Sequence, residues 1–296
     1  MDGSASNRNS RHSTLSVRCA GAAGAALAFA AACTGSVHST SSDADGATGV
    51  AVRDEVSGNA SAAVAAVDRW AADLESTTVA VAVLDRQTGE FAQGEAAATP
   101  MYSASLVKVI VAVDLLQRSH GGEPLSDVDR ELIRRALSAS DDEAMNVLWD
   151  QHDGLGGVVR VAEQAGLAET RPPEDPAMWG QTVVSARDLA RVFAYILDVL
   201  PEADREFIMS SLASAPERAA DGFEQDFGLA AQPGDTVKSA WMCCFGGKIA
   251  LHTAGTTKNS QRYIVALLSK QPVSVGYRQA RATLTEAARQ ALSQLR

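Results

Sequence analysis

Strand-like segments lie near both ends of this 296-residue sequence, and a long block of helix-like segments separates them. Alternating valines in residues 77–85 and a turn at residues 86–89 predict a β-hairpin that ends near Gly94. Three further β-rich runs follow the helical block, at residues 236–244, 249–253 and 262–269. This order predicts an α+β fold: one antiparallel five-stranded sheet from both chain ends, flanked by helices, with an inserted all-helical lobe.

The remaining regular segments are predicted to be helices. One covers residues 60–74, before the first strand, and another closes the chain at residues 278–295. Residues 171–182 include three prolines and show no periodicity, so they are predicted to form a loop. The inserted lobe is predicted to hold five helices, at residues 126–139, 141–152, 157–165, 185–200 and 203–213.

The first 33 residues are similar to an export signal. Three arginines precede a short apolar run, Ala20–Ala32, which is too short to span a bilayer as a stable helix. The run ends in Ala30-Ala31-Ala32-Cys33, which resembles the lipobox of bacterial lipoproteins, and Cys33 would then carry the lipid. We therefore expect an extracytoplasmic protein that is anchored to the membrane by this lipid. Secretion with cleavage nearby and a disordered alanine-rich tail are the alternatives.

Composition divides the rest of the chain in two. Residues 34–60 are rich in Ser, Thr, Gly, Asp and Ala, and they are predicted to be a flexible tether. Residues 61–296 hold every predicted strand and would form the folded domain. The formal net charge of −10 argues against a nucleic-acid partner, which requires a basic surface. We expect the domain to act as a monomer and to meet the membrane only through its N-terminal lipid.

The cysteines and histidines predict neither a disulfide framework nor a metal site. Cys19 would leave with the signal, and Cys33 would be lipidated. Cys243 and Cys244 are adjacent, and a bond between neighbours is strained, so we expect them on opposite faces of one strand. These residue types form no His-x-x-x-His or Cys-x-x-Cys cluster, so no metal or other cofactor is expected. His252 is expected to be structural.

A Ser-x-x-Lys pair, Ser105 and Lys108, stands at the start of a long apolar run. Residues three apart share a face of a helix, so the serine hydroxyl and the lysine amine would meet. Burial by apolar neighbours lowers a lysine pKa, and a neutral amine can accept the serine proton. The alternatives are a chance occurrence of a short motif and a buried strand, which the β-branched residues favour. The length of the run, from Ser105 to Gln117, favours the helix.

Two further motifs follow in a fixed order, and together the three resemble the penicillin-recognising serine enzymes, most closely the class A β-lactamases. The family's Ser-Asp-Asn loop is matched by Ser140-Asp141-Asp142, between two predicted helices. Its Lys-Thr-Gly strand is matched by Lys238-Ser239-Ala240, on the first returning strand. The resemblance extends from about residue 60 to the end of the chain and implies the same α+β fold.

This resemblance implies a serine hydrolase that opens β-lactam amides through an acyl-enzyme. Ser105 would attack the carbonyl carbon, and Lys108 would hold or move its proton. Ser140 would pass a proton to the leaving nitrogen. In class A enzymes a glutamate on a loop after a Thr-Arg pair serves deacylation, and Glu174 follows such a pair here at a short spacing. Glu174 is therefore either this catalytic residue or a solvated loop acid.

Five positions would bind the substrate. Lys238 and Ser239 would attract and hydrogen-bond a substrate carboxylate, and the backbone N–H of Trp241 would join that of the nucleophile in an oxyanion hole. Asp142 replaces the family's asparagine, so the amide donor to a substrate carbonyl is lost. Ala240 replaces its glycine, and the added methyl group would crowd the strand edge.

Three functions are compatible with these residues. The first is hydrolysis of small-molecule β-lactams. The second applies the same acyl-enzyme chemistry to D-alanyl peptides or esters, with slow release of penicillin if Glu174 is misplaced. The third is a non-catalytic, tethered binding protein that kept the fold, which Asp142 and Ala240 favour. The presence of the full set of Ser105, Lys108, Ser140 and Lys238 favours an enzyme, because a binding protein does not need these four residues.

Overall fold

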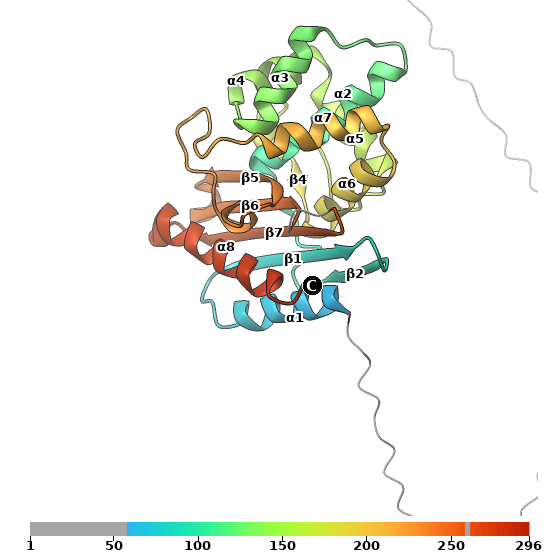
Figure 1. Cartoon of the computed structure of the whole chain (residues 1–296). Coiled ribbons are helices and arrows are strands. Elements are labelled where there is room, and N and C mark those ends of the chain that lie inside the picture. Colours follow the sequence, from blue (N-terminus) through green and yellow to red (C-terminus); the bar gives the residue numbers. More distant parts are fainter. Residues whose placement is uncertain (1–57, 258–260, 296) are drawn as a thin grey trace, which may run out of the picture. The chain divides into compact units, whose positions relative to one another are not determined.

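The structure is a computed structural model that describes residues 58–257 and 261–295 (Figure 1). The predicted export signal, Cys33 and the tether up to residue 57 lie outside the described residues. Within the described part of the chain, no helix has both the length and the apolar character needed to cross a membrane. The first helix, α1, begins at Asn59, close to the predicted start of the folded domain.

The central sheet consists of five antiparallel strands in the spatial order β2-β1-β7-β6-β5. Strand β1 pairs with β7, so the N-terminal hairpin joins the three C-terminal strands in one sheet, and the predicted architecture is confirmed. Strands β6 and β7 are longer than predicted, because they pair with each other along their whole length. The strands are β1 (Thr78–Asp85), β2 (Glu90–Gln93), β5 (Thr236–Cys243), β6 (Lys248–Thr256) and β7 (Tyr263–Pro272).

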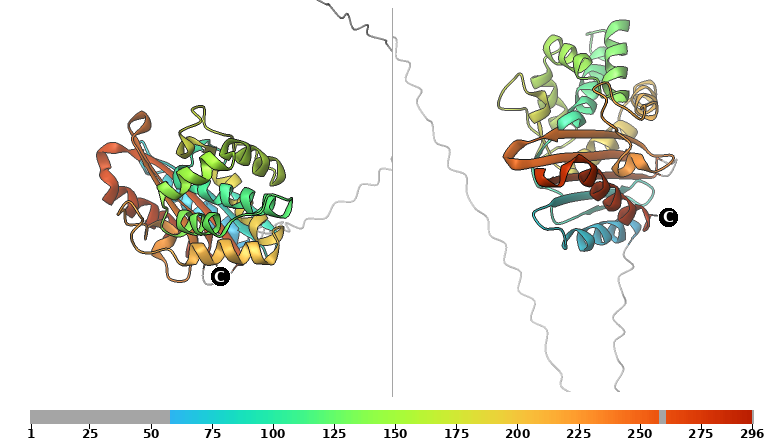
Figure 2. Two further views of the ribbon diagram at one scale, coloured as in Figure 1. Left: turned by 90° about the horizontal axis from the view of Figure 1, so that it is seen from above. Right: turned by 90° about the vertical axis from the view of Figure 1, so that its left-hand side faces the viewer.

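Side chains on the two faces of the sheet belong to two separate hydrophobic cores. Val79, Val81 and Val83 of β1 pack in one core with helices α1 (Asn59–Ala71) and α8 (Gly276–Leu292). Ala80 and Ala82 of the same strand pack in the other core, with the helical lobe. This alternation is the two-residue periodicity from which the strand was predicted. Figures 1 and 2 show α1 and α8 against the sheet on the side away from the lobe.

The helical lobe is formed by the chain between β2 and β5. Its central helix, α2 (Val107–His120), is buried at every residue from Val107 to Leu116. A helix that is apolar on all sides must be surrounded by other elements, and five helices supply the surroundings. They are α3 (Asp127–Ser138), α4 (Asp142–Gln151), α5 (Gly154–Gln164), α6 (Ala186–Asp198) and α7 (Glu202–Ala213), all close to their predicted positions.

A second sheet, formed by β3 (Met101–Tyr102) and β4 (Val183–Val184), is absent from the prediction. Each strand has only two residues, which is too few to produce a periodic pattern. Tyr102 pairs with Val183, and the backbone N–H of Ser103 donates to the carbonyl oxygen of Thr182 at 2.7 Å. This sheet ties the segment before Ser105 to the end of the proline-containing loop.

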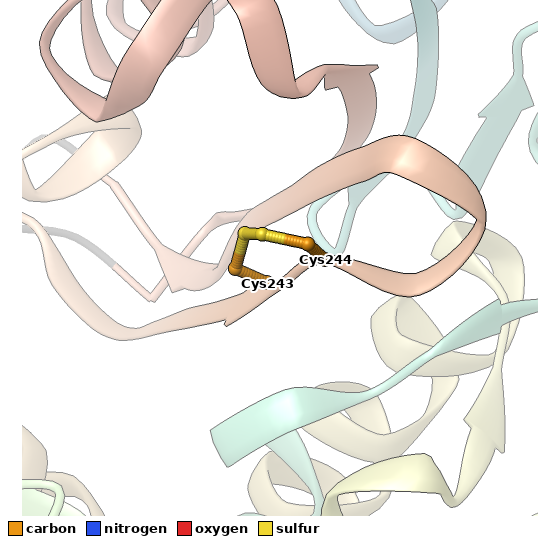
Figure 3. Close-up of a disulfide and its surroundings, with 2 residues drawn as sticks. All are labelled: Cys243 and Cys244. Carbon is orange, nitrogen blue, oxygen red and sulfur yellow. A yellow bond between two sulfur atoms is a disulfide. The ribbon is translucent and has the colours of Figure 1, made fainter.

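Cys243 and Cys244 form a disulfide bond (Figure 3). This corrects the prediction that their side chains lie on opposite faces of one strand. Strand β5 ends at Cys243, so Cys244 already belongs to the turn that leads to β6, and the alternation of a pleated strand does not apply to it. The next residue, Phe245, packs its ring edge-on against Tyr102, with 5.3 Å between the ring centroids.

His252 of β6 is completely buried and connects the sheet to the segment before Ser105. Its Nε2 lies 3.0 Å from the carbonyl oxygen of Tyr102, and its Nδ1 accepts a 3.3 Å hydrogen bond from the backbone N–H of Ser269. Both contacts are satisfied by the neutral imidazole with its proton on Nε2. Burial lowers the pKa of His252 to about 4.

The buried His252 predicts a loss of stability in mild acid. Between about pH 6.5 and 4, the unfolded chain binds a proton at this residue that the folded protein does not. We expect the free energy of unfolding to fall by about 3 kcal/mol as the pH falls through this range. In His252→Gln, which cannot take up the proton, the fall should be smaller by this amount. Urea unfolding across the range measures both proteins, and equal pH dependence would exclude His252 as the cause.

Candidate active site

Ser105 lies in a short 3-10 turn, η1 (Ala104–Leu106), that leads directly into α2. The preceding residue, Ala104, has a left-handed backbone with a φ of 46°. This conformation costs a non-glycine residue about 1 kcal/mol or more, and such residues cluster at functional sites. Only 6% of Ser105 is exposed, and the residue borders a cavity.

Lys108 lies one turn further along, and its side chain is completely buried. Its Nζ donates to Oγ of Ser105 at 3.0 Å and to the carbonyl oxygen of Ser140 at 2.6 Å, and it forms an ion pair with Oδ1 of Asp142 at 2.6 Å. Oγ of Ser140 is 3.3 Å from the same nitrogen. The structure therefore brings the Ser-x-x-Lys pair and the second motif together around one amino group.

The loop between α3 and α4 places Ser140 and Asp142 beside Lys108. Ser140 has a left-handed backbone with a φ of 52°. Asp141 caps the N-terminus of α4, since its Oδ1 accepts from the backbone N–H of Ala144 at 3.0 Å, and its other oxygen binds Arg135. Asp141 is thus fixed by structural contacts, whereas the side chain of Asp142, which is 60% exposed, borders a cavity.

Two opposing effects set the protonation of Lys108. Burial lowers its pKa, the nearby carboxylate of Asp142 raises it, and burial prevails. Lys108 therefore releases its proton more readily than an exposed lysine does, as a base for Ser105 must. The ring of Trp179 lies 4.9 Å from Nζ, and this cation–π contact stabilises the ammonium form.

The third motif lies on β5, at the edge of the sheet. Lys238 is buried, and burial, together with the charge of Lys108, lowers its pKa well below the ordinary value. Its Nζ donates to the carbonyl oxygen of Ser239 at 3.0 Å, and the hydroxyl of Ser239 donates to the carbonyl oxygen of Gln225 at 2.8 Å. Both side chains border a small cavity of about 130 Å³ between α7 and β5, away from Ser105.

A larger cavity, of about 450 Å³, opens beside Ser105. This volume is in the range that small-molecule sites occupy. Ala240 is completely buried in the core and does not line the cavity, whereas Trp241 does. The lining residues are Ala104, Ser105, Asp142, Ala177, Met178, Trp179, Gly180, Trp241, Met242, Cys243 and Tyr277.

Glu174 does not line this cavity. It is exposed, and in the described part of the chain its side chain makes no hydrogen bond or ion pair. A later part of the same loop places Trp179 at the cavity, where its Nε1 donates to Oδ1 of Asn146 at 2.8 Å. Sequence reasoning missed Trp179 and Tyr277. For Trp179, the only signal in the sequence is a tryptophan in a proline-containing loop. For Tyr277, the sequence of α8 gives no signal.

Comparison with known proteins identifies the family. A family model described as "Beta-lactamase enzyme family" matches residues 129–295. Putative lipoproteins named LppW, from Mycobacterium tuberculosis and Mycobacterium bovis, are 36% identical over 220 residues, which cover 72% of this chain and 68% of theirs. The chain therefore belongs to the β-lactamase enzyme family.

Solved structures show that the fold is that of class A β-lactamases. The putative class A β-lactamase PenP from Rhodopseudomonas palustris superposes with a TM-score of 0.62 at 20% identity, covering 77% of this chain and 98% of PenP. A mutant of PBP-A, solved as an acyl-enzyme complex with penicillin G, gives a TM-score of 0.62 at 17% identity, covering 78% of this chain and 95% of PBP-A. The resemblance predicted from the three motifs is confirmed at the level of family and fold.

The ion pair with Asp142 is expected to hold Lys108 in its protonated form. Asp142→Asn replaces the carboxylate by an uncharged group of the same shape, so the pKa of Lys108 should fall further. A ¹⁵N NMR titration of the side-chain amine measures it. Glu143→Gln, which removes a neighbouring exposed charge on α4, should have a much smaller effect. Equal shifts in both variants would mean that net charge controls the pKa and that the 2.6 Å contact does not.

Proposed function

We propose that the protein is a serine hydrolase of the class A β-lactamase type, which opens β-lactam amides through an acyl-enzyme on Ser105. The observation that carries this proposal is the buried contact of 3.0 Å between Nζ of Lys108 and Oγ of Ser105. In its neutral form, Lys108 accepts the hydroxyl proton while Oγ attacks the carbonyl carbon of the substrate. A catalytic use explains why a lysine is buried at the start of α2, where a well-packed apolar residue would serve stability equally well.

Ser140 would complete the proton transfer to the leaving group. Its hydroxyl lies 3.3 Å from Nζ of Lys108, so it can donate its own proton to the leaving nitrogen as the C–N bond breaks. Ser140 then takes up the proton that Lys108 received. We assign the oxyanion hole to the backbone N–H groups of Ser105 and Trp241. This assignment is supported by the position of β5 as an edge strand and of Trp241 in the cavity lining.

Release of the acyl group is expected to be the slow step. Deacylation needs a base that accepts a proton from the attacking water. Glu174 could serve as this base only if its loop brought it to the cavity, which it does not line. Asp142 is the only carboxylate among the lining residues that the structure describes, and it is held by Lys108 at 2.6 Å. The acyl-enzyme should therefore persist longer than in an enzyme whose carboxylate beside the ester is not held in an ion pair.

The positions of Lys238 and Ser239 favour a second candidate function, which is binding without turnover. Both side chains donate to backbone carbonyl groups of the protein itself, so the pair predicted to bind a substrate carboxylate is engaged internally. A D-alanyl peptide or ester remains the alternative substrate for the enzymatic function. It would follow the same route as a β-lactam, with an open-chain amide or ester bond broken in place of the lactam.

Penicillin labelling tests the nucleophile. Mass spectrometry of the protein after exposure to penicillin G should show one penicilloyl adduct on Ser105, which decays slowly because the one carboxylate among the described lining residues is paired with Lys108. Ser105→Ala should abolish the adduct, and an adduct that persists in this variant would refute the assignment.

Asp142→Asn should be labelled by penicillin G roughly tenfold faster than the wild-type protein. The variant gains an amide donor and loses a charge that repels the penicillin carboxylate.

The putative lipoproteins among the relatives support a proposal for location. We infer that Cys33 is lipidated and that the domain is held outside the cytoplasmic membrane. Metabolic labelling with an alkyne-bearing fatty acid should therefore mark the wild-type protein. Cys33→Ser should lose the label, whereas Cys19→Ser, which changes the other N-terminal cysteine, should keep it. A label that survives in Cys33→Ser, or recovery of the uncleaved protein from the cytosol, would contradict the inference.

A further inference from the structure

The cavity beside Ser105 has aromatic rings on the side formed by β5 and α8, and a carboxylate that α4 contributes. None of its described lining residues is a lysine or an arginine, and Asp142 is the only charged residue among them. Trp241 of β5 and Tyr277 of α8 contribute aromatic rings to the same lining. A substrate group that enters here meets a carboxylate and aromatic rings, but no exposed cation.

A second carboxylate, Asp221, lies next to this lining. It is exposed, and its Oδ2 accepts a 3.0 Å hydrogen bond from Nε1 of Trp241. Burial, and after it the charge of Asp221, raises the pKa of Tyr277. Asp221 therefore acts on two of the side chains that line the cavity, and its charge adds to that of Asp142.

The nearby cations are engaged away from this side of the cavity. Lys108 is paired with Asp142 at 2.6 Å, and its side chain is completely buried. Lys238 donates to a backbone carbonyl group and borders the smaller cavity. Arg281 of α8 is paired with Glu224 and is not among the lining residues. The two carboxylates are therefore the charges that an entering group meets first.

We propose that the acyl donor carries a positive charge on its leaving group: an ester or amide whose departing alcohol or amine bears an ammonium group. The inference rests on the proposed acyl-enzyme function. The backbone N–H of Trp241 is assigned to the oxyanion hole, so the groups bound to the attacked carbonyl carbon lie beside β5, where Trp241 contacts Asp221. An ammonium group here is attracted by Asp221 and Asp142 and contacts the ring of Tyr277 and the face of Trp241 that is not stacked on Phe223. A carboxylate at the same place is repelled.

Three esters of phenylacetic acid test this charge preference, with glycolate, glycolamide and N-(2-aminoethyl)glycolamide as the anionic, neutral and cationic leaving alcohols. Attack by Ser105 breaks the C–O bond to the alcohol, which departs with a proton, and all three esters leave the same phenylacetyl group on Ser105. Mass spectrometry of this adduct therefore compares acylation alone. We expect the cationic ester to react fastest, by roughly fivefold for each unit of charge at low ionic strength. Salt at about 0.5 M should reduce the differences.

Two variants of equal net charge locate the source of the preference. Asp221→Asn should reduce the preference for the cationic ester roughly fivefold, while its amide oxygen can still accept the hydrogen bond from Trp241. Asp73→Asn removes an exposed charge just after α1, a helix that contributes no residue to the described lining of the cavity, and should leave the preference unchanged. Equal rates for the three esters, a faster anionic ester, or equal effects of the two variants would overturn the proposal.

Binding measurements separate this inference from the proposed function. Calorimetric titration of Ser105→Ala with the three corresponding amides reports the charge preference without any acylation. If no ester labels Ser105 but the cationic amide binds most tightly, the acyl-enzyme function is wrong and the charge preference stands. If the three esters label Ser105 at equal rates, the acyl-enzyme function stands and the charge preference is wrong.

Discussion

A lysine amino group buried at the start of α2 is the interaction on which the rest of the site depends. Removing such a group from water costs several kcal/mol unless protein atoms replace its hydration. For Lys108 the replacements are Oγ of Ser105, both oxygens of Ser140 and Oδ1 of Asp142. The loop before α4 and the first residue of that helix supply three of these four contacts, so the amino group is fully coordinated only when α4 packs beside α2. Burial and the Asp142 carboxylate then oppose each other, which leaves the proton on Lys108 exchangeable.

The position of Ser105 is fixed by contacts that converge on Tyr102, three residues earlier. Strand β4 pairs with Tyr102 from the end of the proline-containing loop. His252 binds its carbonyl oxygen from β6, and Phe245, next to the disulfide, packs against its ring. Three elements that are distant in the sequence thus hold one segment from different sides. The left-handed backbone of Ala104 then turns the chain into α2. Several independent contacts to the same segment keep the strained backbone of Ala104 in place.

The sequence predicts the sheet and the helices well because their signals are periodic and local. The alternating valines of β1 and the mostly apolar first ten residues of α2 each indicate which faces are buried. The Ser105–Lys108 contact follows from helical spacing alone. Other features depend on contacts that no local pattern encodes. The two-residue strands β3 and β4 have no period, and the disulfide of Cys243 depends on where β5 ends.

The loop of residues 171–182 shows the same limit most clearly. The position of Glu174 after a Thr-Arg pair predicts a role at the site, but the path of a loop is decided by its tertiary contacts. The structure brings Trp179 to the cavity through a hydrogen bond with Asn146 of α4, and it leaves Glu174 in solvent. No local pattern predicts the charge beside the cavity either, because Asp221 acts on it through the side chains of Trp241 and Tyr277, which are distant in the sequence.

The pairing of β1 with β7 has a consequence for how the protein is made. Strand β1 leaves the ribosome early, and its partner is among the last segments to be synthesised. The sheet therefore cannot close until translation is almost complete, since long-range pairing must wait for both strands. Strand β5, which borders the nucleophile, is also made late. A growing chain of this topology therefore has no assembled site around its serine until the last strands have been made.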